Sequence, residues 1–192
     1  MRVALFDYGA ENLHSLGKAL EGGGAKVEVT GDWDVALGAD ALVLPGVGSF
    51  GAAVRALQDR IGDVRDALEG GLPCLGICLG MQLLFPESEE GPGRGIGLFA
   101  GKVVRLDAPV VPQIGWNEVR SEDDSLLIAY YANSFVCQPD DESAVTAWSE
   151  YAGVRFPAAI RRGRTVGVQF HPEKSSKAGV AMVHGFLAET AR

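Results

Sequence analysis

A cysteine between glycines is the feature of this sequence that most directly indicates chemistry. Gly76-Ile77-Cys78-Leu79-Gly80 lies where an apolar segment predicted as a strand, Pro73–Ile77, meets a predicted helix, Leu79–Phe85. A strand–turn–helix elbow of this kind presents a nucleophile, and its glycines leave room for a crowded backbone. The start of the helix favours negative charge on the sulfur. Cys78 is therefore the candidate nucleophile, and a small buried cysteine without a chemical role is the alternative.

A possible base and an orienting carboxylate follow a second predicted strand. Thr165–Phe170 alternates as a strand should and continues into His171-Pro172-Glu173. Because proline favours an extended backbone in the residue before it, His171 and Glu173 can share one face. Glu173 could then hold the imidazole in the tautomer that leaves one nitrogen free as a base. Alone, this tripeptide fits an ordinary surface histidine, but together with Cys78 it completes a nucleophile, base and orienting group.

A glycine-rich loop is predicted near these groups. Pro45-Gly46-Val47-Gly48 follows the predicted strand Ala41–Leu44, and Ser49 could cap the helix after it. Backbone N–H groups in such a loop can stabilise an oxyanion or bind a phosphate. A nucleotide P-loop is excluded because no Gly-Lys-Ser/Thr follows. The alternative is a tight turn between strand and helix with no other role.

The elements that would position these motifs alternate between strand and helix in the first half of the chain. Strands are predicted at 2–6, 26–30, 41–44, 73–77, 102–106, 117–120, 126–131, 144–149, 158–161 and 165–170. Helices are predicted at 13–21, 51–57, 64–69, 79–85 and 176–189, and a loop at 86–97. We expect an α/β fold with an open, mostly parallel twisted sheet, helices on both faces and a strand-rich C-terminal half. The cysteine elbow would lie at the carboxyl end of a central strand, where ligands bind in such sheets.

Composition limits the classes of function. With 192 residues, 47% hydrophobic and 22% charged, the chain is expected to form a single globular domain over residues 1–192. A formal net charge of -8 argues against a nucleic-acid-binding surface. No apolar run approaches the ~18 residues of a membrane span, and the first apolar run is too short for a signal peptide. The three cysteines suggest neither a disulfide framework nor a zinc site. We expect a cytoplasmic protein without metal or cofactor.

The cysteine and histidine motifs resemble those of the class I (triad) glutamine amidotransferases. A finer resemblance, to the glutaminase subunits of imidazole glycerol phosphate synthases, covers nearly the whole chain in the family's order. It rests on Asp7-Tyr8-Gly9 with Asn12, Pro45-Gly46-Val47-Gly48, Gln82-Leu83-Leu84-Phe85, Glu89-Glu90-Gly91-Pro92-Gly93, Gly115-Trp116-Asn117 and His171-Pro172-Glu173-Lys174-Ser175. Gly-Trp-Asn and the Lys174-Ser175 pair are the specific parts. The resemblance implies a flavodoxin-like arrangement of the sheet.

The resemblance also implies an activity. Cys78 would attack the carboxamide of glutamine, His171 would transfer the proton, and Glu173 would orient His171. The backbone of Gly46, Val47 and Leu79 would form the oxyanion hole. Contacts to glutamine are implied for Gly48, Gln82, Glu90, Ser134 and Phe135.

A partner is implied as well. Ammonia would pass to a separate (β/α)₈ cyclase subunit, which makes imidazole glycerol phosphate and aminoimidazole carboxamide ribotide in histidine biosynthesis and stimulates the glutaminase. Partner contacts are implied for Asn12, Gln113, Trp116, Asn117 and Lys174. This chain departs from the family pattern where Gln113 and Asn133 replace histidines and where Phe135 lacks a hydroxyl. These departures affect hydrogen bonding at the interface and the way in which the backbone of glutamine is held. For Trp116, burial in the core is the alternative.

Three other readings compete with this function. An amidotransferase subunit of another pathway would share the triad, but Gly-Trp-Asn and Lys174-Ser175 disfavour it. A non-catalytic module on the same fold is disfavoured because Cys78, His171 and Glu173 are all present. A cysteine peptidase or stress protein could use the same kind of sheet. Against that reading, His-Pro-Glu together with Gln82 favours glutamine as the substrate.

Overall fold

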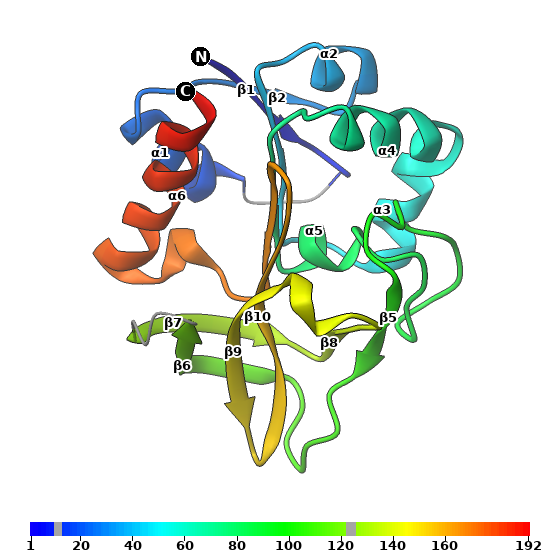
Figure 1. Ribbon diagram of the computed structural model, residues 1–192, viewed down its shortest axis with the longest axis vertical. Helices are drawn as coiled ribbons and strands as arrows, with labels where there is room; N and C mark the ends of the chain where they lie inside the picture. The colour runs from blue at the N-terminus through cyan, green and yellow to red at the C-terminus, as the bar shows by residue number, and fades with distance from the viewer. Residues whose placement is uncertain (10–12, 122–125) are drawn as a thin grey trace.

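The computed structural model describes residues 1–9, 13–121 and 126–192, and within these ranges a nine-stranded sheet forms the centre of the molecule (Figure 1). The order of its strands is β2-β1-β3-β4-β11-β10-β9-β6-β7. The strands of this sheet are β1 (Arg2–Phe6), β2 (Lys26–Thr30), β3 (Ala41–Leu44), β4 (Cys74–Ile77), β6 (Gln113–Ser121), β7 (Leu126–Asn133), β9 (Val145–Tyr151), β10 (Val154–Arg162) and β11 (Thr165–Val168). A separate antiparallel pair consists of β5 (Gly101–Arg105) and β8 (Phe135–Pro139).

The large sheet has a parallel part and an antiparallel part. Strands β2, β1, β3, β4 and β11 run parallel to their neighbours in this order. Strands β10, β9, β6 and β7 extend the sheet in antiparallel fashion. The expected α/β fold is therefore confirmed, and the strand-rich C-terminal half supplies the antiparallel extension.

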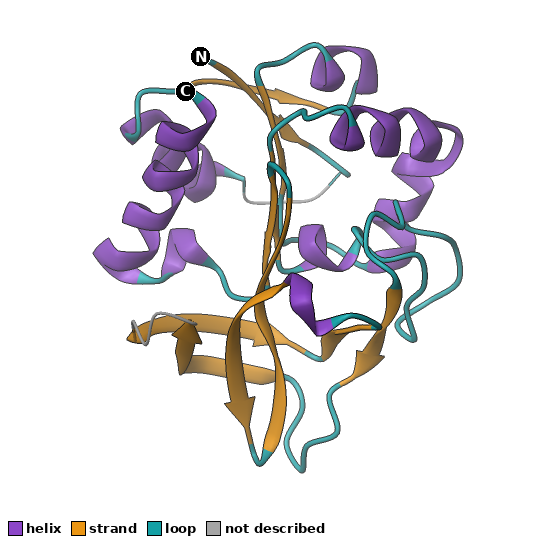
Figure 2. Cartoon of the chain, in the orientation of Figure 1, coloured by secondary structure: helices purple, strands orange, loops and turns teal. Residues whose placement is uncertain are grey.

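Helices cover both faces of the parallel part. They are α1 (His14–Gly22), α2 (Trp33–Leu37), α3 (Phe50–Leu57), α4 (Ile61–Glu69), α5 (Leu79–Gln82) and α6 (Ser176–Thr190), together with short 3₁₀ helices at Gln58–Arg60, Glu142–Ala144 and Pro172–Lys174. Figure 2 shows α1 and α6 on one side of the sheet and the other helices on the opposite side. The sheet has a hydrophobic core on each face, and successive residues of a central strand point into opposite cores. In β1, Ala4 and Phe6 pack with α2 and α3 on one face. Val3 and Leu5 pack with α1 and α6 on the other face.

Some of the predicted boundaries were wrong. The helix after the cysteine ends at Gln82, not at residue 85. The carbonyl oxygens of Leu83 and Leu84 accept hydrogen bonds from the backbone N–H groups of Ile96 (2.7 Å) and Phe99 (3.1 Å), so the chain leaves the helix to pair with the 95–99 segment. Strand β8 and helix α2 were not predicted, and β6 begins at Gln113, four residues before the predicted start.

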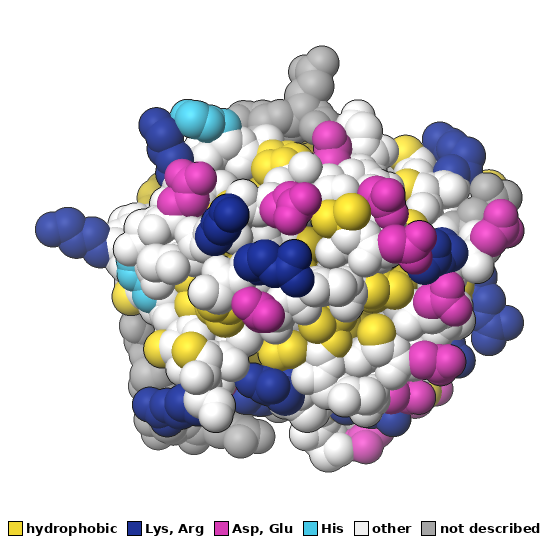
Figure 3. Space-filling model, turned by 90° about the horizontal axis from the view of Figure 1, so that it is seen from above, with side chains coloured by type: hydrophobic (Ala, Val, Ile, Leu, Met, Phe, Trp, Pro, Cys, Tyr) yellow, Lys and Arg dark blue, Asp and Glu magenta, His cyan; other side chains and the backbone are white. Residues whose placement is uncertain are grey.

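The surface carries charges of both signs. Figure 3 shows acidic and basic side chains interspersed with apolar ones over the face at the top of Figure 1. Across residues 1–9, 13–121 and 126–192, no helix combines the length and the apolar character needed to cross a membrane.

Candidate active site

Cys78 lies on a strained elbow between β4 and α5. Its backbone has φ 46° and ψ -102°, a region that residues other than glycine rarely occupy, and its side chain is buried. The flanking glycines are required by close packing. A Cβ at Gly80 would lie 2.0 Å from the carbonyl oxygen of Leu44, and one at Gly76 would lie 2.7 Å from the carbonyl oxygen of Gly80. The structure thus confirms the predicted strand–turn–helix elbow.

His171 and Glu173 form a buried pair beside this elbow. Nδ1 of His171 lies 2.9 Å from Oε1 of Glu173, and their side chains are only 4% and 8% exposed. This contact leaves Nε2 of the imidazole free to face Cys78, whose Cβ lies beside Gly46 together with Cε1 of His171. The three side chains therefore form a connected Cys-His-Glu arrangement.

The electrostatics of this pair favour a charged imidazole. Burial by itself lowers the pKa of His171, but hydrogen bonds to Cys78 and Glu173 and their negative charges outweigh it and raise the pKa to about 9. The raised pKa favours the protonated imidazole, which is the form that could give a proton to a leaving group.

The loop Pro45-Gly46-Val47-Gly48 lies against Cys78 and His171. A Cβ at Gly46 would lie 2.8 Å from Cε1 of His171 and 2.9 Å from Cβ of Cys78, so the Gly46 backbone contacts both side chains. Gly48 has φ 110°, which only glycine adopts readily. Val47 lies between these two glycines, and Leu79 begins α5 directly after the cysteine. The residues predicted to supply oxyanion donors thus flank the sulfur.

Part of the predicted glutamine pocket is also assembled here. Nε2 of Gln82 donates to the carbonyl oxygen of Phe135 at 3.1 Å, and Nδ2 of Asn133 donates to the same oxygen at 3.1 Å. Ser134 lies between these two residues, and its carbonyl oxygen accepts from the N–H of Leu106 (2.9 Å). The start of β8 is therefore fixed against α5 by buried amides.

Glu90 lies at the start of α3, the helix that follows the glycine loop. One of its carboxylate oxygens accepts from the backbone N–H of Phe50 at 3.2 Å, and Ser88 Oγ accepts from its own N–H at 3.1 Å. A carboxylate in this place is favoured by the helix dipole. Glu90 is thus held beside the loop that carries Gly48.

One functional candidate, Gln169, was missed by the sequence reasoning. Its side chain is fully buried, its Nε2 lies 3.5 Å from Sγ of Cys78, and its Oε1 lies 3.4 Å from Nε2 of Gln82. A signal was present, because Gln169 lies two residues before His171 and can point to the same side. Glu173, which was expected to continue this alternation, instead lies in the 3₁₀ helix Pro172–Lys174 and reaches the imidazole from that turn.

The residues predicted to contact a partner do not all lie on one surface. Ile114 (67% exposed), Trp116 (56%) and Ile128 (53%) are apolar side chains on the paired strands β6 and β7. The Tyr130 ring packs edge-on against Trp116, with 6.0 Å between ring centres, and Nζ of Lys174 lies 5.9 Å from the Tyr130 ring. We call Ile114, Trp116, Ile128 and Tyr130 the β6–β7 face. Because the side chain of Trp116 is exposed on this face, the alternative that Trp116 is buried in the core was wrong.

Other predicted contact residues are placed differently. Gln113 is buried, and its Oε1 has no hydrogen-bond partner among the described residues. The amide of Asn117 donates to the carbonyl oxygen of Glu150 at 2.8 Å, joining β6 to β9. Asn12 lies outside the described residues.

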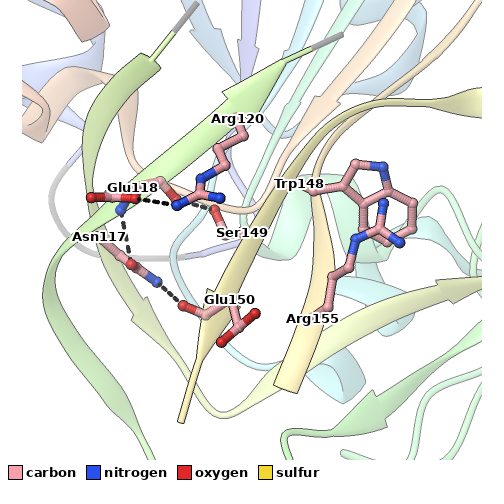
Figure 4. Close-up of a pocket in the computed structure, with 7 residues that line it drawn as sticks. All are labelled: Asn117, Glu118, Arg120, Trp148, Ser149, Glu150 and Arg155. Atoms are coloured by element: carbon pink, nitrogen blue, oxygen red, sulfur yellow. Dashed lines mark hydrogen bonds and ion pairs between the residues drawn. The ribbon is translucent and has the colours of Figure 1, made fainter. Parts of the chain in front are cut away.

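A hollow of about 290 Å³ lies between β6 and β9, and no triad residue lines it (Figure 4). Several of its polar groups are already partnered. Arg120 pairs with Glu118 at 3.0 Å, and the guanidinium of Arg155 stacks 3.6 Å from the centre of the Trp148 ring. In the part of the chain that the structure describes, no three His, Cys, Asp or Glu side chains gather in a way that could hold a metal ion.

Comparison with known proteins agrees with this geometry. The family model for glutamine amidotransferase class-I matches residues 4–189, so the chain belongs to this family of enzymes. A crystal structure of a glutamine amidotransferase superposes with a TM-score of 0.79 at 19% identity and covers 99% of both chains. A chain in the structure of PurLQS from Thermotoga maritima gives a TM-score of 0.80 at 19% identity, covering 100% of this chain and 99% of the other. At such identities these two likenesses show the fold alone.

Relatives with higher sequence identity place the chain in a particular branch of this family. The chain is 42% identical to the imidazole glycerol phosphate synthase subunit HisH of Geobacillus kaustophilus, over 96% of this chain and 95% of the relative. It is 43% identical to HisH of Nocardia farcinica, over 96% of each chain, and 42% identical to HisH of Aquifex aeolicus, over 97% and 96%. Within the class I amidotransferases, the chain therefore falls among the HisH subunits.

Proposed function

We propose that this chain is the glutaminase subunit of an imidazole glycerol phosphate synthase and that it hydrolyses L-glutamine to glutamate and ammonia through a thioester on Cys78. The observation that carries the proposal is the buried Cys78–His171–Glu173 arrangement on a strained elbow. The proposal takes residues 1–192 as one amidotransferase domain. It includes a cytoplasmic location, where the free cysteines Cys74, Cys78 and Cys137 would stay reduced.

The reaction would proceed in two halves. Sγ of Cys78 attacks the carboxamide carbon of glutamine, and the oxygen of the tetrahedral intermediate is held by backbone N–H groups of Val47 and Leu79, with Gly46 leaving room for the loop. His171 gives its proton to the leaving nitrogen, which departs as ammonia and leaves a glutamyl thioester. His171, now neutral, takes a proton from water, and the resulting hydroxide attacks the thioester. The C–S bond then breaks, which restores the Cys78 thiolate beside the protonated His171, and glutamate leaves after the second water proton is lost to solvent.

Binding of glutamine would use groups around the elbow. The carboxylate of Glu90, held at the start of α3, suits the α-ammonium group of the substrate. Gly48, Ser134 and Phe135 would contact the rest of its backbone. Nε2 of Gln82 is hydrogen-bonded within the protein, so Gln82 would meet the substrate through its oxygen, as an acceptor.

Delivery of ammonia needs a partner, and the β6–β7 face is the surface that fits one. Large aromatic side chains such as Trp116 dominate many interfaces, and 56% of this side chain is exposed. Lys174, beside the Tyr130 ring, could pair with an acidic residue across the contact. We propose that a barrel-type cyclase subunit docks here through Trp116, Lys174 and neighbouring residues, with Asn12, Gln113 and Asn117 supporting the contact region. The complex would channel ammonia into imidazole glycerol phosphate and AICAR in histidine biosynthesis, and docking would stimulate the glutaminase.

The decisive experiment combines labelling with activity. The chain is purified with the cyclase subunit of its own organism, and glutamate release is measured with Cys78→Ala and, as the matched control, Cys74→Ala. We expect Cys78→Ala to abolish glutamate release, while the complex still makes product from ammonium salt. A glutamine-like chloroketone should label Cys78 and spare Cys74 and Cys137. Full glutamate release by Cys78→Ala, or no product with the cyclase and ammonium salt, would contradict the proposal.

A further inference from the structure

A second side chain besides His171 reaches the sulfur of Cys78. Nε2 of Gln169 lies 3.5 Å from Sγ, within hydrogen-bonding distance for sulfur, and the side chain is fully buried. Gln169 follows β11 directly, and its own backbone N–H donates to the carbonyl oxygen of Ala158 at 2.9 Å, so the sheet fixes its position. A buried amide in this place has few ways to change its contacts.

The orientation of the Gln169 amide follows from its neighbours. The carbonyl oxygen of Phe135 can only accept, so the group of Gln82 that faces it at 3.1 Å must be the NH₂. The same NH₂ faces the Gln169 amide at 3.4 Å, so an oxygen of Gln169 must stand there. The NH₂ of Gln169 is therefore directed at the sulfur. A backbone carbonyl thus decides which end of the Gln169 amide the nucleophile meets.

We infer that Gln169 is a further catalytic residue, which donates a hydrogen bond to the sulfur of Cys78 and is held in that orientation by Gln82. An N–H donor stabilises negative charge on sulfur, which is the form that attacks the carboxamide. The donor also keeps Sγ fixed while the imidazole of His171 turns from the sulfur to the leaving nitrogen. This inference rests on the proposed role of Cys78 as nucleophile.

The test measures the sulfur without using the substrate. Iodoacetamide is reacted with the whole chain at a series of pH values, and mass spectrometry follows the label on Cys78. In Gln169→Met the donor is lost. In Gln169→Glu the shape is kept, but a carboxylate oxygen replaces the NH₂, so this variant loses the donor and also adds a negative charge that repels a thiolate. We expect both variants to alkylate Cys78 about tenfold more slowly at pH 7, as loss of one hydrogen bond to a charged group implies, and the rise in rate to move to higher pH.

Apart from the carboxylate that Gln169→Glu adds, the titratable groups near the sulfur are unchanged in these variants. They are His171, its partner Glu173, and Cys137 of β8, whose pKa is raised first by burial and then by the negative charge of Cys78. Thr165→Val is the matched control, because Thr165 is buried at the start of β11 and the change keeps its shape. This control should alkylate like the parent chain. Thermal unfolding of each variant shows whether it is folded.

Gln82 provides the test of orientation. Gln82→Met cannot donate to Gln169, so no donor would hold the Gln169 amide with its NH₂ towards the sulfur. This variant should slow alkylation as much as Gln169→Met, and the double variant should be no slower than either single one. Glutamine hydrolysis by Gln169→Met should show a lower kcat with little change in KM.

The outcomes separate the two proposals. If folded Gln169→Met and Gln169→Glu alkylate Cys78 with the pH profile of the parent chain, the role of Gln169 is refuted, whatever the activity of Cys78→Ala. If Cys78→Ala still hydrolyses glutamine, the proposed nucleophile is wrong, whatever the alkylation profile. Additive effects of Gln82→Met and Gln169→Met would refute the orienting role of Gln82.

Discussion

The backbone N–H of His171 donates a 2.8 Å hydrogen bond to the carbonyl oxygen of Tyr130. In return, the N–H of Tyr130 donates to Oγ of Ser175 at 2.9 Å, and that hydroxyl donates to the carbonyl oxygen of His171 at 2.6 Å. The three residues form a closed ring of hydrogen bonds. Because the Tyr130 ring packs on Trp116, this ring joins the histidine of the site to the β6–β7 face. A partner that shifts β7 would therefore shift His171.

Replacing Ser175 by alanine tests this ring. Ser175 is fully buried, so Ser175→Ala would leave the N–H of Tyr130 without its acceptor and the carbonyl of His171 without the hydroxyl. We expect a loss of about 1–3 kcal/mol in the free energy of unfolding, measured in urea, and slower glutamine hydrolysis. Ser176→Ala, at the exposed neighbouring position, should behave like the parent chain. Equal stabilities of the two variants would show that the ring contributes nothing.

A methyl group at Gly46 should disable the site. It would lie within 3.0 Å of Cε1 of His171, Cβ of Cys78 and the carbonyl oxygen of Ile77, so the triad must move to make room. We expect Gly46→Ala to lose at least roughly a hundredfold in the rate of glutamate release, since a displacement near 1 Å has that effect. Gly62→Ala is the control. It lies within α4 with open space around its Cα and should slightly raise thermal stability. Normal glutaminase activity of Gly46→Ala would contradict the contacts described.

The parts of the site that could be predicted are those set by local sequence. The elbow around Cys78 follows from flanking glycines whose short-range packing leaves no room for a side chain. The His171–Glu173 pair was predicted from an extended segment, and the pair forms, but through the 3₁₀ helix Pro172–Lys174. The contacts of Gln169 with Cys78 and Gln82 and the ring through Ser175 depend on which strands become neighbours, and local patterns do not carry that information. The helix after Cys78 was predicted too long for the same reason, because its end is set by pairing with residues 95–99.

If the cyclase subunit docks on the β6–β7 face, substitutions on this face should weaken its binding and substitutions elsewhere should not. Trp116→Ala removes a half-exposed aromatic side chain that would become buried in a complex. We expect binding to the cyclase subunit, measured by calorimetry, to weaken by about 2 kcal/mol, or roughly thirtyfold in Kd. Val29→Ala is the matched control, since Val29 is 54% exposed on β2, at the opposite edge of the sheet from β7. Equal affinities of the two variants would place the partner on another surface.

The raised pKa of His171 predicts how stability depends on pH. This pKa is about 9 in the folded chain, against 6.5 for an ordinary histidine. Below pH 6.5 the imidazole is protonated in both the folded and the unfolded chain, so its favourable contacts contribute fully. Between pH 6.5 and 9 the unfolded chain loses the proton first, and the contribution falls as pH rises through the folded pKa.

Glu173→Gln measures how much the carboxylate of Glu173 contributes to this pH-dependent stability. It removes the negative charge that lies 2.9 Å from Nδ1 of His171 and keeps the size of the side chain. The parent chain should therefore be more stable than Glu173→Gln by roughly 1–2 kcal/mol at pH 6, and this difference should shrink towards zero above pH 9. Urea unfolding at half-unit steps of pH measures the difference directly. A difference that stays constant or grows with rising pH would mean that Glu173 does not stabilise a charged His171, and the histidine would then start the reaction as a neutral base.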